Sequence, residues 1–207
     1  MRKQIVVAFI AATAALCSFG CTTNTVTLSY VGAGTAKPAV APAVHVSVGD
    51  FSDNRHEPSQ WIGAIRGGYG NPLKKLETDK PVAELVKEAF RQALIARGLY
   101  ASDGQVVVSG WIDRLDGDQY ARKEATVQLH VSVADRTTKR EILSRPASSN
   151  QVEGSMVTMK AGVFGSVEIL RSLIERVLSN AVDSFVDNSA FREVLLVSGT
   201  PEKPERR

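Results

Sequence analysis

The residue best placed to undergo chemistry in this chain is Cys21. A short basic start precedes an apolar run from Ile5 to Leu16, and small residues then lead up to the cysteine. This order is typical of a bacterial export signal that ends at a lipid-attachment site, where the thiol receives acyl chains such as palmitate. As a helix, the apolar run would be roughly 18 Å long, which is shorter than the ~30 Å of a membrane span. We therefore predict a lipoprotein signal peptide over residues 1–20 and a lipid-modified Cys21.

Two alternatives to lipidation of Cys21 stay open. Cys17 follows Leu16, a bulky residue that suits neither a lipoprotein peptidase nor the small-x-small cleavage rule. An ordinary secretory signal cut at the same place would instead leave Cys21 as a free thiol, and Ser18 stands where lipoprotein signals usually carry Leu. Thr22 follows the cysteine, where lipoproteins retained in the inner membrane carry Asp. By resemblance to lipoproteins of diderm bacteria, this implies that the protein is located on the periplasmic face of the outer membrane.

Residue types that carry catalysis are sparse. His45 and His130 are expected on the polar faces of strands and His56 in a loop, and none has another ligand at metal-binding spacing. The segment Gly162–Ser166 resembles a hydrolase elbow only superficially, and Ser166 suits a helix cap better. No phosphate-binding loop or GxGxxG motif is present. We therefore predict a protein without enzymatic activity, metal or cofactor.

The run Asp50–Arg55 places oxygen ligands at alternating positions, as calcium loops do. The pattern then stops, because no glycine follows at the sharp turn and no glutamate closes the loop. The alternative is that Asp50, Asp53 and Arg55 cap and brace the end of a strand, and we favour it.

A long segment, residues 57–77, is expected to be a loop and the first candidate contact site. It combines Trp61, Ile62, Arg66 and Tyr69 with several glycines, and long loops rich in aromatic residues and arginine are typical of contact surfaces. The alternative is that this segment is a lid on the core, which would bury Trp61 and Ile62.

A second stretch joins the last strand to the last long helix. Met156, Met159 and Phe164 would form an adaptable contact patch if exposed and would complete the core if buried. The sequence leaves both alternatives open.

The rest of the chain divides by composition. We expect a flexible tether over 21–43, which is rich in Thr, Ala, Gly and Pro, one domain over 44–196, and a disordered charged tail over 197–207. Removing the signal takes away two basic residues and no acidic one, so 25 basic residues become 23 against 22 acidic ones. A formal charge of about +1 gives no case for binding nucleic acid.

The hydrophobic pattern predicts strands at 44–48, 106–113 and 125–133, and a fourth from Arg140 on with Pro146 at a sheet edge. Thr25–Val31 also alternates briefly, as an edge strand would. A helix is expected to begin after Pro81 and close at Gly98, a second to begin after Ser166, and a short turn of helix to follow over 190–196. The core should include Leu85, Phe90, Leu129, Val131, Leu173 and Ile174.

The order β-α-β-β-β-α predicts an α+β fold of two layers. The first crossover makes the first two strands parallel, and the later strands pair as an antiparallel meander. We therefore expect a mixed, mostly antiparallel four-stranded sheet with two main helices packed on one face.

Five segments carry a family resemblance: Cys21, Asp50–Arg55, Ala96–Leu99, Asn150–Gly154 and Gly162–Glu168. With them the chain resembles the YajG-like lipoproteins, a bacterial envelope family. The resemblance covers the expected domain and implies location and fold more than activity. The element order is also similar to that of periplasmic adaptor domains, such as auxiliary lipoproteins of transport systems.

Three classes of function follow. The first is a non-catalytic accessory or adaptor that is held on the membrane by its lipid and binds another envelope protein. The second is a binder of a small amphiphile, lipid or cell-wall fragment, and the third is a hydrolase. An exposed apolar patch would favour the first class, an enclosed pocket the second and a buried acid–base cluster the third.

Overall fold

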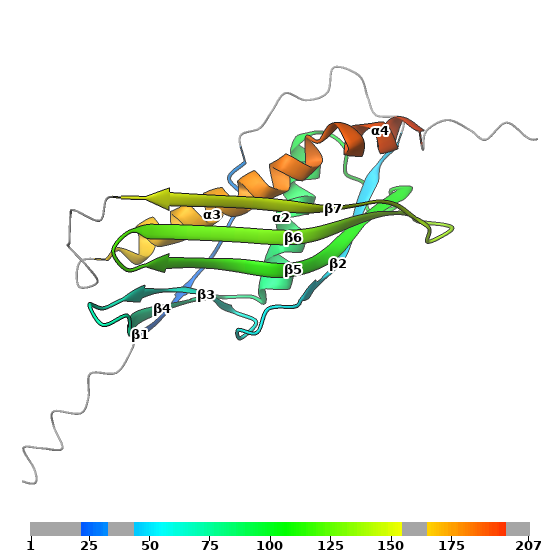
Figure 1. The fold of residues 1–207 in the computed structure, drawn as a ribbon. Coiled ribbons are helices and arrows are strands. Elements are labelled where there is room, and N and C mark those ends of the chain that lie inside the picture. Colours follow the sequence, from blue (N-terminus) through cyan, green and yellow to red (C-terminus); the bar gives the residue numbers. More distant parts are fainter. Residues whose placement is uncertain (1–21, 33–43, 155–164, 198–207) are drawn as a thin grey trace, which may run out of the picture.

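The computed structural model describes residues 22–32, 44–154 and 165–197, which form one sheet and three helices (Figure 1). In chain order the elements are β1 (Thr22–Val26), β2 (Val46–Asp53), β3 (Trp61–Arg66), β4 (Pro72–Thr78), α2 (Val82–Ala96), β5 (Val106–Gln119), β6 (Lys123–Asp135), β7 (Glu141–Glu153), α3 (Val167–Val186) and α4 (Ser189–Val197).

The sheet is mixed and has seven strands in the order β1-β4-β3-β5-β6-β7, with β2 also paired to β5. Strands β5, β6 and β7 are antiparallel neighbours, and β2 lies parallel to β5. The α+β class, the predicted meander and the predicted parallel pair are therefore confirmed. Pro146 lies in β7, which among the described strands pairs only with β6 and is an edge strand. The expected number of four strands is wrong, because β1, β3 and β4 extend the sheet.

The segment expected as a long loop is the hairpin of β3 and β4. The four inner residues of β3 are all buried, so the strand shows no alternation of polar and apolar residues. Gly63 of β3 pairs with Gly117 of β5, and a Cβ at Gly63 would lie 1.9 Å from the carbonyl oxygen of Gly117. The glycine is therefore required for β3 to approach β5, which places the hairpin in the sheet.

Residues 22–32 belong to the fold, so the expected tether over 21–43 is wrong for this part of the chain. Strand β1 pairs in parallel with β4, from Thr22 opposite Lys74 to Val26 opposite Thr78. Leu28 then enters the core with 7% of its surface exposed. The polar sequence of β1 resembles a linker, and its pairing partner lies about fifty residues away, which explains why composition alone predicts a tether.

The helices α2 and α3 pack against one face of the sheet, as expected (Figure 1). Helix α2 closes at Gly98, whose φ of 68° is left-handed, and the amide of Leu99 donates to the carbonyl of Leu94 at 2.9 Å. Helix α3 begins after Ser166, whose hydroxyl accepts a hydrogen bond from the amide of Ile169. The short final helix is α4.

The core lies between the sheet and the helices. All six predicted core residues are buried, with Leu85 the most exposed at 8%. Aromatic rings connect the elements: Phe90 of α2 stacks on Phe51 of β2 at 5.1 Å, and Phe185 of α3 meets both Phe90 and Phe191 of α4. Such ring contacts add to the stability gained from burial and hold α4 against α3.

Candidate contact surfaces

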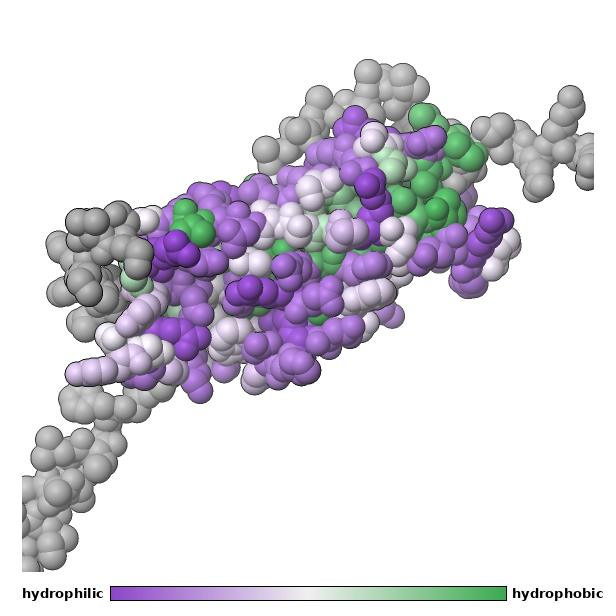
Figure 2. All heavy atoms as spheres, viewed as in Figure 1, coloured by the Kyte–Doolittle hydropathy of each residue, from purple (hydrophilic) through white to green (hydrophobic). Residues whose placement is uncertain are grey.

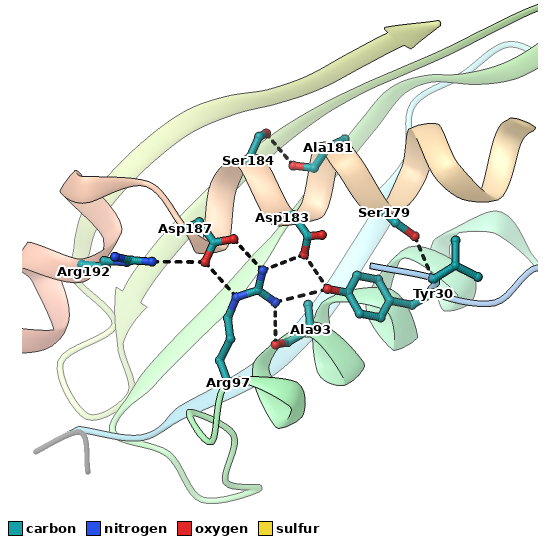
Figure 3. Close-up of polar contacts among 10 residues, drawn as sticks. Tyr30, Ala93, Arg97, Ser179, Ala181, Asp183, Ser184, Asp187 and Arg192 are labelled. Carbon is teal, nitrogen blue, oxygen red and sulfur yellow. Dashed lines mark hydrogen bonds and ion pairs between the residues drawn. The ribbon is translucent and has the colours of Figure 1, made fainter. Parts of the chain in front are cut away.

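A buried cluster around Arg97 joins α2, α3 and the N-terminal segment (Figure 3). Arg97 follows the last residue of α2, and only 5% of its side chain is exposed. Its guanidinium donates to both oxygens of Asp187 at 2.9 and 2.6 Å and to Asp183 at 2.8 Å. It also donates to the hydroxyl of Tyr30 at 3.2 Å, and that hydroxyl donates in turn to Asp183. We define Tyr30, Arg97, Asp183 and Asp187 as the N-terminal clamp.

The charges of the clamp are balanced by a residue outside it. The clamp holds one arginine and two carboxylates, and Arg192 reaches Asp187 from the exposed side at 3.3 Å. Hydrogen bonding to Asp187 raises the pKa of Arg97 and outweighs the opposing effect of burial. Burial, and next the hydrogen bond to Asp183, raise the pKa of Tyr30. Arginine stays protonated here and cannot act as a base, so the cluster suits a structural role better than acid–base catalysis.

The backbone of the N-terminal segment is held along α3. The amide of Ser29 donates to Glu175 at 2.9 Å, and the amide of Val31 donates to the hydroxyl of Ser179 at 2.9 Å. Arg171 donates to the carbonyl oxygen of Thr27 at 3.3 Å. Residues 27–31 are therefore fastened by side chains of one helix rather than by strand pairing.

A second buried arginine braces the sheet where β2 ends. Arg55 has 2% of its side chain exposed, pairs with both oxygens of Asp53, and donates to the carbonyls of Trp61 and Leu115. Asp50 instead pairs with Lys87 of α2 at 2.8 Å. The structure thus agrees with the expected bracing role of Asp53 and Arg55.

The four residues of the first candidate contact site separate in the structure. Ile62 is fully buried, as the core-lid alternative requires, whereas Trp61 is only half-buried. Arg66 is half-exposed and pairs with Asp118 at 2.8 Å. Hydrogen bonding to Asp118 raises the pKa of Arg66. Tyr69 is fully exposed in the β3–β4 turn, and of the four it is the residue most available for contact.

Several predicted site residues lie outside the described part of the chain. They are the lipidation site Cys21 and the second candidate patch, Met156, Met159 and Phe164.

Sequence reasoning missed an aromatic pair on the open face of the sheet. Trp111 of β5 stacks on His130 of β6 with ring centroids 4.0 Å apart, and His130 Nε2 lies 2.8 Å from the hydroxyl of Ser144. The alternation of side chains between the two faces along β5 places Trp111 on the polar face of the sheet. This alternation was the sequence signal that could have revealed the pair. His130 is thus half-buried by its neighbours rather than fully solvated.

Apolar side chains are exposed at the end of the molecule that carries α4. Figure 2 shows them gathered over α4 and the adjoining part of the sheet. On α4, Leu196 and Val197 are 73% and 67% exposed, and Ile142 at the start of the neighbouring strand β7 is 41% exposed. We define Ile142, Leu196 and Val197 as the α4 patch. Neighbouring apolar residues that stay exposed are typical of contact sites.

A groove of about 740 Å³ lies between the N-terminal segment, β2 and α2. Its apolar wall includes Leu28, Phe51 and Leu85, while charged side chains, including Lys87 and Arg91, line the rest. Arg91 pairs with Glu88 and Lys87 with Asp50, so these cations are already neutralised. The volume suits a small ligand, but the lining is more charged than that of a usual ligand pocket.

The described residues contain no group of three or more His, Cys, Asp or Glu side chains arranged to hold a metal ion. Within the same residues, no helix combines the length and the apolar character needed to cross a membrane.

The fold is similar to that of solved structures. A protein from Xanthomonas campestris, assigned to the family model DUF330, is 16% identical over 86% of this chain and 100% of its own, with a TM-score of 0.60. An uncharacterised protein is 6% identical over 84% and 99% of the two chains, with a TM-score of 0.53. A lipoprotein from Neisseria meningitidis, 12% identical over 70% of this chain and 99% of its own, reaches 0.29, too low to carry an argument.

No family model and no curated protein matches the chain. At these identities, the likeness to the first two structures shows that the α+β fold is shared. It carries no information about activity.

Proposed function

We propose that this protein is a lipid-anchored accessory protein of the bacterial cell envelope that works by contact rather than by catalysis. Its anchor is an acylated Cys21, its location is the periplasmic face of the outer membrane, and its partner is another envelope protein. The export signal that ends at Cys21 supports the anchor. The resemblance of several segments to YajG-like lipoproteins, and Thr22 after the cysteine, support the location.

The α4 patch is the observation that carries the contact function. Leu196 and Val197 are mostly exposed, although both are large apolar residues. Arg192 and Glu193 are exposed one helical turn before them on α4, so the apolar residues adjoin polar ones, as they do in a protein interface. The patch lies at the opposite end of the molecule from β1 (Figure 1), so a protein anchored near β1 would present it away from the membrane.

Site-specific photocrosslinking in intact cells tests this function. A crosslinker in place of Leu196 should give one discrete protein adduct, and Val197→Asp should abolish it. The matched control is Ile169, which is 45% exposed in the first turn of α3, roughly 30 Å from α4 along the helix. The same adduct from position 169, or no adduct from position 196, would contradict a contact function for the patch. An adduct of two copies of this chain would show that the patch binds a second copy of this protein and not a different partner.

The groove beside α2 favours a second candidate, the binding of a small amphiphile, lipid or cell-wall fragment. Its size is adequate, but Lys87 and Arg91 in its wall are already paired with carboxylates, and for this reason we rank it below contact with a protein. An added amphiphile that raises the melting temperature of the wild type, but not that of Phe51→Asp, would support this alternative instead.

A further inference from the structure

The proposed lipid anchor has no spacer between it and the sheet. Thr22 is the first residue of β1, it lies opposite Lys74 of β4, and its hydroxyl donates to the carbonyl of Leu73 at 3.4 Å. Consecutive Cα atoms are ~3.8 Å apart. Cys21 is bonded to Thr22, so its acyl chains would begin one residue from a position that is paired with Lys74, near the start of β4.

The chain that follows cannot swing away from the domain. Strand β1 is paired along its length with β4, and the amides of Ser29 and Val31 are held by α3. The N-terminal clamp then holds Tyr30. A lipid on Cys21 would therefore keep this end of the domain beside the membrane.

Two turns lie at the same end of the molecule as the start of β1 (Figure 1). The β3–β4 turn carries Tyr69, which is fully exposed, and the β5–β6 turn carries Tyr120, which is 45% exposed. The hydroxyl of Tyr120 donates to the carbonyl of Gly68 at 2.7 Å and so ties the two turns together. Tyrosine is enriched where proteins meet the headgroup level of a bilayer, because its ring is apolar and its hydroxyl polar.

The charges beside these turns include cations that are not neutralised. Lys74 and Lys75 of β4 make no ion pair with the described residues, whereas Arg66 pairs with Asp118. Lys75 is exposed, and Lys74 donates to the carbonyl of Gly165 at 3.1 Å. Exposed lysines near a bilayer are attracted to anionic lipid headgroups.

We propose that this end of the molecule rests on the membrane that holds the anchor, with Tyr69 and Tyr120 in the headgroup region and Lys75 facing lipid phosphates. The occupant of the surface is an anionic phospholipid bilayer. The inference rests on the proposed anchor at Cys21, and it adds a defined orientation in which the α4 patch points into the periplasm.

The experiment uses the mature lipoprotein reconstituted into vesicles of phosphatidylcholine and phosphatidylglycerol that contain a headgroup-level quencher lipid. A Gly68→Cys variant carries an environment-sensitive fluorophore next to Tyr69, where added atoms meet nothing within 4 Å. The matched control is Thr137→Cys in the β6–β7 turn. Strand β6 has 13 residues and spans roughly 40 Å, so the control label is far from the bilayer.

We expect a blue-shifted, quenched label at position 68 and an unquenched one at position 137. Tyr69→Ala and Lys75→Glu should each reduce the quenching at position 68 while the protein still floats with the vesicles. Equal quenching at both positions in protein that floats would overturn the orientation and leave the anchor intact. Protein that does not float would refute the anchor, and the orientation with it.

Discussion

The guanidinium group of Arg97 lies 2.8 Å from the carboxylate of Asp183, and this ion pair joins the end of α2 to α3. The same carboxylate accepts the hydroxyl of Tyr30. One pair of buried charges thus connects the helical layer to the segment that follows the proposed anchor. A pull on the lipid would be transmitted to the core through this contact and through β1.

Arg97→Ala should lower the free energy of unfolding by about 3–5 kcal/mol, because it leaves two carboxylates without their buried partner. Arg192→Ala is the control within the same cluster. Its side chain is 64% exposed, so its ion pair with Asp187 should contribute no more than about 1 kcal/mol. Urea unfolding of both variants measures the difference. Equal losses would show that the clamp is not the main electrostatic link between the helices.

Substitutions at the two ends of the β3–β4 hairpin should change the free energy of unfolding by different amounts. Ile62→Ala should cost about 2–5 kcal/mol, since the side chain is fully buried and its removal leaves a cavity. Tyr69→Ala should change the free energy of unfolding by no more than about 0.5 kcal/mol, since the ring is fully exposed. Thermal and urea unfolding test the pair. A large loss for Tyr69→Ala would mean that the turn supports the fold and is not simply a contact element.

The sequence predicts the elements whose burial is one-sided. Helix α2 and strand β6 each carry an apolar face and a polar face. Their apolar residues therefore recur with periods of 3.6 and 2 in the sequence, and these periods identify the core residues. Strand β3 is buried along its inner residues and β1 is mostly exposed and polar, so neither shows a period. Strand β1 pairs with β4, about fifty residues away, and β3 pairs both with β4 in a hairpin and with the distant β5, and a local pattern does not encode such long-range pairs.

The N-terminal clamp was missed for a similar reason. An arginine at the end of a helix, such as Arg97 beside Gly98, is typical of an exposed residue that favours the negative end of the helix dipole. Its burial depends on Asp187, 90 residues later, and on Tyr30, 67 residues earlier. The contact role of Tyr69 and the lipidation of Cys21 stay predictions, since they concern partners and chemistry beyond the fold.

Acid should weaken the brace formed by Asp53 and Arg55. Burial alone would raise the pKa of Asp53, but hydrogen bonds and charge from Arg55 outweigh it and lower that pKa. A carboxyl group whose pKa is lowered by folding adds stability above its unfolded value of about 3.9, and this stability is lost as the pH falls through the folded value. The gap in unfolding free energy between the wild type and Asp53→Asn should therefore be largest near neutral pH and narrow below about pH 4. A gap that stays constant with pH would contradict this assignment.

Membrane attachment should depend on one of the two cysteines. Cys21→Ser removes the thiol that we propose to be acylated, so this variant should leave the membrane fraction and appear with the soluble periplasmic proteins. Cys17→Ser is the matched control, because Cys17 belongs to the expected signal peptide and leaves with it, and this variant should stay membrane-bound. Fractionation with mass spectrometry of the mature N-terminus separates the alternatives. An unmodified N-terminus on the wild type would refute the anchor, and release of both variants would show that membrane attachment does not depend on Cys21 alone.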